Sequence, residues 1–145
     1  DLELQEYVQR VGEKLAAVPA LHPDVTVIHA QRADRQGNVL MWGVVGAQKE
    51  AVLCAKRAIV TVEEIVDKLD APMNAVVLPK WVIGAVCEVK RGAFPSYALG
   101  FYQRNNSFYK QWDTIARERA TFEAWIDKHV RGTKDNREFL ESLER

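Results

Sequence analysis

Hydrophobic and polar positions divide the first half of the chain into short apolar runs separated by polar turns. The stretch Asp24–Trp42 holds two apolar runs on either side of the polar segment 34–38, whose residue types tolerate tight or left-handed backbone. This pattern predicts a strand, a turn and a second strand. The apolar run that begins the second strand continues to Gly46.

Up to residue 89, further apolar runs that suit strands alternate with segments whose apolar residues have helical spacing. Residues 47–56 predict a short helix with favourable basic residues at its C-terminal end. Residues 58–62, AIVTV, are typical of a strand in a parallel sheet that is buried on both faces. The acidic segment 63–67 is expected to form one helical turn before another strand at 74–78, and residues 81–89 are apolar again.

The two ends of the chain differ. Residues 1–10 carry a weak helical stripe that fits a helix and a linker equally, and residues 14–18 before Pro19 are expected to be extended. The last third predicts three helices, with Asn105 or Asn106 capping the first and Asp135 the last. Their stripes are Phe108, Trp112, Ile115 and Ala116; Phe122, Trp125, Ile126 and Val130; and Phe139, Leu140 and Leu143. Strands alternating with helices, followed by helices, indicate an α/β layered fold.

Composition and charge narrow the classes of function. The 145 residues suit one domain, residues 1–145, with a helical C-terminal segment at 105–145. Lys plus Arg and Asp plus Glu both number 20, so no net field attracts nucleic acid, and we expect none as a partner. No apolar run approaches the roughly 20 residues that span a bilayer, and no signal peptide opens the chain. Cys54 and Cys87 form no CxxC motif, which favours a reduced, cytoplasmic location.

Few side chains form a recognised catalytic or metal-binding pattern. The three histidines lack metal-ligand spacing, and we expect no metal site. The adjacent Glu63 and Glu64 are expected to point to opposite faces of a strand end, so they cannot act as a carboxylate pair. Neither GxGxxG nor GxxxxGK[ST] occurs, and Ser96 lacks a GxSxG motif. The aromatic residues between 94 and 112 suit a core, although Tyr and Trp also line ligand clefts.

Four ordered runs carry a resemblance to a known family. They are PALHPDVTVIHAQRADRQGNV, EAVLCAKRAIVTVEEIV, NAVVLPKWVIGAVCEV and GAFPSYALGFYQRNNSFYKQW. Together they resemble the A subunit of family I coenzyme A transferases of the glutaconate CoA-transferase type, from about residue 12 to residue 130. The resemblance implies an α/β fold with an open, mostly parallel sheet flanked by helices and a helical C-terminal segment.

The resemblance also implies an activity and partners. Such enzymes move coenzyme A from an acyl-CoA to a carboxylic acid through a glutamyl-CoA thioester, by covalent carboxylate catalysis. The nucleophilic glutamate lies on the B subunit, and its motif is absent here, so we expect no catalytic residue in this chain. Coenzyme A would be a substrate, with no tightly bound cofactor. Because A subunits are about twice as long, the chain resembles a C-terminal half, and its expected partners are the N-terminal half of the A subunit together with the B subunit.

The resemblance leaves the substrate open. We expect Gln31, Trp42, Ser96 and Tyr97 to line one wall of the substrate site. Phe94 and Leu99 stand where the family resemblance predicts histidines, and Asn105 where it predicts aspartate. Two alternatives therefore remain. The chain could belong to a hydrolase of the same fold that acts on acyl-CoA or cleaves a ring, or it could be a non-catalytic assembly module.

Overall fold

The computed structural model describes residues 22–144, and the expectations for residues 1–18 lie outside this range. The chain divides into two compact units, one ending at Lys90 and the other beginning at Arg91. We call them the sheet unit and the helical unit, and each is described by itself. That residues 1–145 form a single domain stays a prediction.

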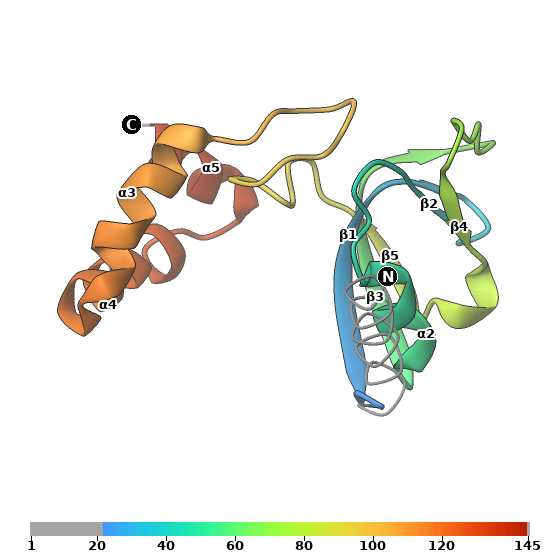
Figure 1. The fold of residues 1–145 in the computed structure, drawn as a ribbon, viewed down its shortest axis with the longest axis horizontal. Helices are drawn as coiled ribbons and strands as arrows, with labels where there is room; N and C mark the ends of the chain where they lie inside the picture. Colours follow the sequence, from blue (N-terminus) through green and yellow to red (C-terminus); the bar gives the residue numbers. More distant parts are fainter. Residues whose placement is uncertain (1–21, 145) are drawn as a thin grey trace, which may run out of the picture. The chain divides into compact units, whose positions relative to one another are not determined.

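The described part of the sheet unit contains one five-stranded sheet in the order β4-β2-β1-β3-β5 (Figure 1). β1 pairs with β3 and β3 with β5 in parallel, whereas β2 is antiparallel to both β1 and β4, so β2 alone among these strands runs in the opposite direction. The open, mostly parallel sheet is thus confirmed. The strands are β1 (Val25–Asp34), β2 (Val39–Met41), β3 (Arg57–Val66), β4 (Val76–Leu78) and β5 (Ala85–Glu88), with helix α2 (Gln48–Cys54) and a 3-10 turn (Lys80–Val82) between them.

The turn between β1 and β2 forms as predicted. Asp34 Oδ1 accepts hydrogen bonds from the backbone N–H groups of Gln36 and Asn38, both at 2.9 Å, and Gly37 takes a left-handed φ of 95°. Burial acts to raise the pKa of Asp34, but the hydrogen bonds from Asn38, Gln36 and Gly37 outweigh it and lower the pKa below 3.8. Asn38 Oδ1 also accepts from Lys80 N at 2.9 Å, which joins this turn to the 3-10 turn after β4.

The core of the sheet unit lies on one face of the central strands. Ile28 and Ala30 on β1 and Val60 and Val62 on β3 are buried, and Val52 of α2 packs against them at 1% exposure. Thr26 Oγ1 donates to Ala51 O at 3.0 Å, which fixes α2 on this face. The short helix predicted at 47–56 is therefore confirmed as α2.

Three details of the prediction are wrong. Glu63 and Glu64 do not form a helical turn but extend β3, because β1 continues to pair beside them and supplies polar partners to both carboxylates. Residues 58–62 are not buried on both faces, since Ile59 is 38% exposed on the face that α2 does not cover. α2 ends at Cys54 without a basic residue in its last turn, and Lys56 instead forms an ion pair with Asp24.

The helical unit contains the three predicted helices within the described residues (Figure 1). They are α3 (Asn106–Arg117), α4 (Arg119–Ile126), which continues into a π-helical turn (Asp127–Arg131), and α5 (Asn136–Glu144). Asn105 accepts a hydrogen bond from Phe108 N and is the N-cap of α3. Asp135 accepts from Glu138 N at 2.9 Å at the start of α5, so both predicted caps are present.

The predicted stripes meet in an aromatic cluster. Trp112 and Trp125 are perpendicular, with ring centroids 5.0 Å apart, and Phe108 stacks on Trp112 at 5.4 Å. Phe122 contacts Trp112, and Phe139 of α5 contacts Trp125 at 6.5 Å. Edge-to-face aromatic pairs of this kind hold the three helices together. No helix in residues 22–144 is long and apolar enough to cross a membrane.

The N-cap of α3 provides a test of the helical unit. We expect Asn105→Ala to lower the free energy of unfolding by about 1 kcal/mol, because Phe108 N loses its acceptor. Asn106→Ala is the matched control: it changes the exposed first residue of the helix and should leave stability nearly unchanged. Urea unfolding followed by circular dichroism measures both, and equal losses would contradict the assignment of the cap.

Candidate functional site

Gln31 and Trp42, two of the predicted substrate-binding residues, lie together where β1 meets the end of β2. Gln31 is 7% exposed, its Nε2 donates to Trp42 O at 3.0 Å, and Trp42 N donates to its Oε1 at 3.3 Å. Both ends of the amide therefore bind the Trp42 backbone. The Arg32 guanidinium lies 5.8 Å from the centre of the Trp42 ring. Gln31 thus positions the chain as it leaves β2, and contact of either residue with substrate stays a prediction.

Ser96 and Tyr97, the other two predicted residues, belong to the helical unit. They lie in the loop before α3, where the Phe94–Pro95 peptide bond is cis and Ser96 N donates to Ala93 O at 2.8 Å. Tyr97 is 38% exposed. The structure therefore brings the four residues together as two pairs, each within its own unit.

Two of the three departures from the family resemblance, Phe94 and Asn105, make local contacts. Phe94 lies under the Arg91 guanidinium, 4.3 Å from the ring centre, and tilts against Tyr102 at 6.4 Å. Asn105 serves as a helix cap, a role that aspartate fills equally well. Leu99 is 44% exposed, so an apolar side chain stands at the surface of this loop.

A buried polar group that the sequence analysis missed lies across β1 and β3. His29 Nε2 lies 2.6 Å from Glu63 Oε1, and His29 Nδ1 lies 2.8 Å from Thr61 Oγ1. The Glu63 side chain is only 4% exposed and that of His29 12%. The His29 ring and the Glu63 carboxyl group therefore form a buried hydrogen-bonded pair, with Thr61 at the other ring nitrogen. The parallel pairing of His29 with Thr61, two residues before Glu63, would have indicated this group.

Glu64 has a separate partner, since Arg32 Nε donates to its Oε2 at 2.9 Å. The adjacent carboxylates of Glu63 and Glu64 therefore bind different groups and do not form a carboxylate pair. No cluster of metal-ligating side chains occurs in residues 22–144.

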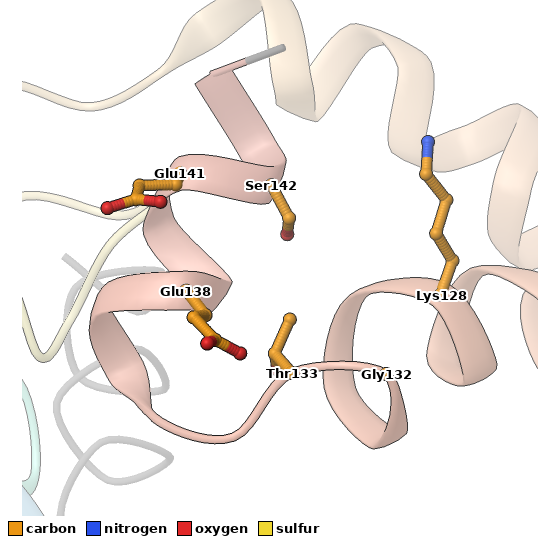
Figure 2. A pocket seen from close by; sticks show the side chains of 6 residues that line it. All are labelled: Lys128, Gly132, Thr133, Glu138, Glu141 and Ser142. Carbon is orange, nitrogen blue, oxygen red and sulfur yellow. The ribbon is translucent and has the colours of Figure 1, made fainter.

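A hollow of about 390 Å³ lies in the helical unit. Figure 2 shows the side chains that line it. The lining residues are Lys128, Gly132, Thr133, Glu138, Glu141 and Ser142. Thr133 Oγ1 donates to His129 O, Glu138 accepts from Lys134 N, and Ser142 Oγ donates to Phe139 O at 2.7 Å. These three side chains therefore bind groups of their own turn and helix.

His129 lies beside this hollow and is 8% exposed. Its ring is 5.0 Å from that of Trp125, and Nδ1 lies 2.8 Å from Ser142 Oγ. Because the Ser142 hydroxyl proton goes to Phe139 O, Nδ1 carries the proton that binds Ser142. Burial lowers the pKa of His129 below 6.5, and the charge of Lys128 lowers it further.

A mixed sheet of this order, followed by a helical unit, is the fold of a coenzyme A transferase subunit. The crystal structure of glutaconate coenzyme A-transferase from Acidaminococcus fermentans matches with a TM-score of 0.73 and 32% identity, over 84% of this chain and 39% of that chain. Residues 4–89 match the family described as coenzyme A transferase, and the chain belongs to this family.

Three relatives of known name share sequence with this chain to different degrees. The chain is 67% identical over 128 residues to the A subunit of the 3-oxoadipate CoA-transferase of Pseudomonas knackmussii, which covers 88% of this chain and 45% of that protein. It is 35% identical to the A subunit of the glutaconate CoA-transferase of A. fermentans, over 91% of this chain and 42% of that one. It is 25% identical to the cholesterol ring-cleaving hydrolase IpdA subunit of Rhodococcus jostii, over 86% and 44%. The chain thus spans less than half the length of these relatives.

The Gln31 amide can be tested by its effect on stability. Gln31→Leu removes the two hydrogen bonds from the side chain to the Trp42 backbone and should lower the free energy of unfolding by about 1 to 3 kcal/mol. Gln36→Leu, at an exposed turn position, is the matched control and should have little effect. Urea denaturation measures both, and an unchanged Gln31→Leu midpoint would contradict the role of the amide.

The lowered pKa of His129 predicts pH-dependent stability. The folded protein binds this proton less tightly than the unfolded chain, so stability is full above about pH 6.5 and falls as the pH drops below it. His129→Gln should reduce the loss of unfolding free energy between pH 7.5 and pH 5.5, and Lys128→Gln should reduce it less. Urea unfolding at both pH values measures these losses, and identical losses in His129→Gln and the unmodified chain would refute the prediction.

Proposed function

We propose that this chain is part of the A component of a CoA-transferase that moves coenzyme A between an acyl-CoA and 3-oxoadipate or a closely related oxo-dicarboxylic acid. The observation that carries the proposal is the 67% identity to the A subunit of 3-oxoadipate CoA-transferase over 88% of the chain. Coenzyme A is a substrate in this proposal, and no tightly bound cofactor is required. Two free cysteines within the described residues are consistent with the cytoplasm as the site of the enzyme.

The proposal requires two partners. One is a B subunit that supplies the nucleophilic glutamate, and the other is the remainder of the A subunit, because the relatives are more than twice the length matched here. The burial of Glu63 against His29 supports a nucleophile elsewhere, whereas Glu64 is 45% exposed and forms an ion pair with Arg32. A carboxylate that attacks a thioester must be accessible to the acyl-CoA.

A second function is favoured by the similarity to the ring-cleaving hydrolase subunit. In that case the same fold would release free coenzyme A to water. We place it second because the identity is 25%, against 67% for the CoA-transferase relative. An assay without an acceptor acid separates the two, since a transferase stops after one turnover and a hydrolase continues.

The proposal predicts coenzyme A transfer by the reconstituted enzyme. The chain would be co-expressed with the remainder of the P. knackmussii A subunit together with the B subunit, then supplied with a panel of acyl-CoA donors and either 3-oxoadipate or glutaconate. We expect 3-oxoadipyl-CoA by mass spectrometry, with a higher kcat/KM for 3-oxoadipate, and no turnover by the chain alone. Turnover by the chain alone, or free coenzyme A at many turnovers without acceptor, would reject the proposal.

Trapping the intermediate locates the nucleophile in the same preparation. Borohydride or hydroxylamine added with acyl-CoA should modify one glutamate of the B subunit. Peptides that contain Glu63 and Glu64 should remain unmodified and serve as the internal control. A label on either of them would show that the nucleophile belongs to this chain.

A further inference from the structure

One face of the parallel part of the sheet is bare in the described residues. Val27 on β1, Ile59 on β3 and Ala85 on β5 are aligned across three neighbouring strands, and all three are exposed. Val27 is 66% exposed, Val25 beside it 49% and Ile59 38%. Cys87, aligned with the next residue on this face of β3, is also exposed. We call these five residues the bare face.

The opposite face of the same strands packs into the core or against it. The residues that alternate with the exposed positions are Ile28, Val60 and Val86. They belong to the core that includes Val52 of α2, or pack against it. Parallel strands are normally covered on both faces, because their connections place helices on each side. A contiguous exposed patch of β-branched side chains on central strands is therefore an incomplete layer, and such patches mark interaction surfaces.

We propose that the bare face is the docking surface for an amphipathic helix supplied by the part of the A subunit that lies outside this chain. This inference rests on the proposed function and identifies the surface that the missing part uses. The length of the relatives supports that occupant, since this chain accounts for 45% and 42% of the two CoA-transferase A subunits. A helix with an apolar stripe over two turns matches a row of apolar side chains across three strands.

The polar groups at one end of the bare face do not oppose docking. His29, Thr61 and Glu63 already bind one another, and the side chains of His29 and Glu63 are 12% and 4% exposed. A helix that covers this face would therefore not leave these groups without hydrogen-bond partners, which is the main cost of burying polar groups. The gain is the transfer of Val25, Val27 and Ile59 out of water.

The two cysteines report on the two faces separately. Cys87 lies on the bare face, whereas Cys54 lies on α2 above the packed face. The chain would be co-expressed with the unmatched part of the P. knackmussii A subunit, which carries an affinity tag, and the purified complex treated with a thiol-specific reagent. Cys87 should react at least about tenfold more slowly in the complex than in the isolated chain, while the rate for Cys54 stays unchanged.

Substitutions on the bare face test the same contact. Val27→Glu should weaken the complex at least about tenfold, in line with the burial of a valine side chain, and Val27→Thr should weaken it less while keeping a β-branched residue in the strand. Leu53→Glu on α2 is the matched control, since Leu53 is 49% exposed on the helix above the packed face. Circular dichroism of each isolated variant checks that its fold is retained.

Several outcomes would overturn the inference. They are failure of the two parts to form a complex, a complex in which Cys87 keeps its reactivity, and an isolated chain in which residues 1–21 or a second copy already protect Cys87. Protection by a second copy would increase with chain concentration. If Cys87 is protected in the complex but no coenzyme A is transferred, the docking surface is supported and the proposed function is rejected. If coenzyme A is transferred while Cys87 stays reactive, the proposed function is supported and the docking surface is rejected.

Discussion

The parallel pairing of β1 with β3 is the interaction on which the rest of the sheet unit depends. It extends over nine residue pairs from Val25 opposite Arg57 to Asp34 opposite Val66, and it is interrupted only where Gln31 faces Glu63. Parallel strands need a crossover connection, and here α2 supplies it and covers the core face in doing so. The interruption falls where the side chain of Gln31 turns to the Trp42 backbone and that of Glu63 to His29. The register of β1 against β3 thus determines which side chains form the core and which polar side chains meet at the end of the sheet.

The helical unit is held together by a different interaction. Its described part contains only short helices, and isolated helices of such length are marginally stable in water. Packing of Phe108, Trp112, Trp125 and Phe139 supplies the tertiary contact that each helix lacks by itself. His129 extends this cluster through its contact with Trp125 and links it to α5 through Ser142. The histidine is therefore part of the core of this unit.

Local signals in the sequence were sufficient for much of this fold. The strand, turn and strand around Asp34 and the caps Asn105 and Asp135 depend on hydrogen bonds between residues no more than four apart, and they formed as predicted. The acidic pair Glu63 and Glu64 could not be placed in this way, because its partners His29 and Arg32 lie 34 and 32 positions away in the sequence. The same limit applies to the site. Four motifs indicated the family, but the bonds of Gln31 to Trp42 depend on how β1 meets β2.

Asn38 has a consequence for the short edge of the sheet. Its side chain binds Asp34 through Nδ2 and Lys80 N through Oδ1, so one amide holds the reversal after β1 and the 3-10 turn after β4 together. β4 lies at the edge of the sheet and pairs with β2 over only three residues, and an edge strand presents unpaired backbone N–H and C=O groups. Anchoring the chain just beyond β4 to the turn at the far end of β1 therefore adds a side-chain contact to the few backbone hydrogen bonds that hold this edge strand.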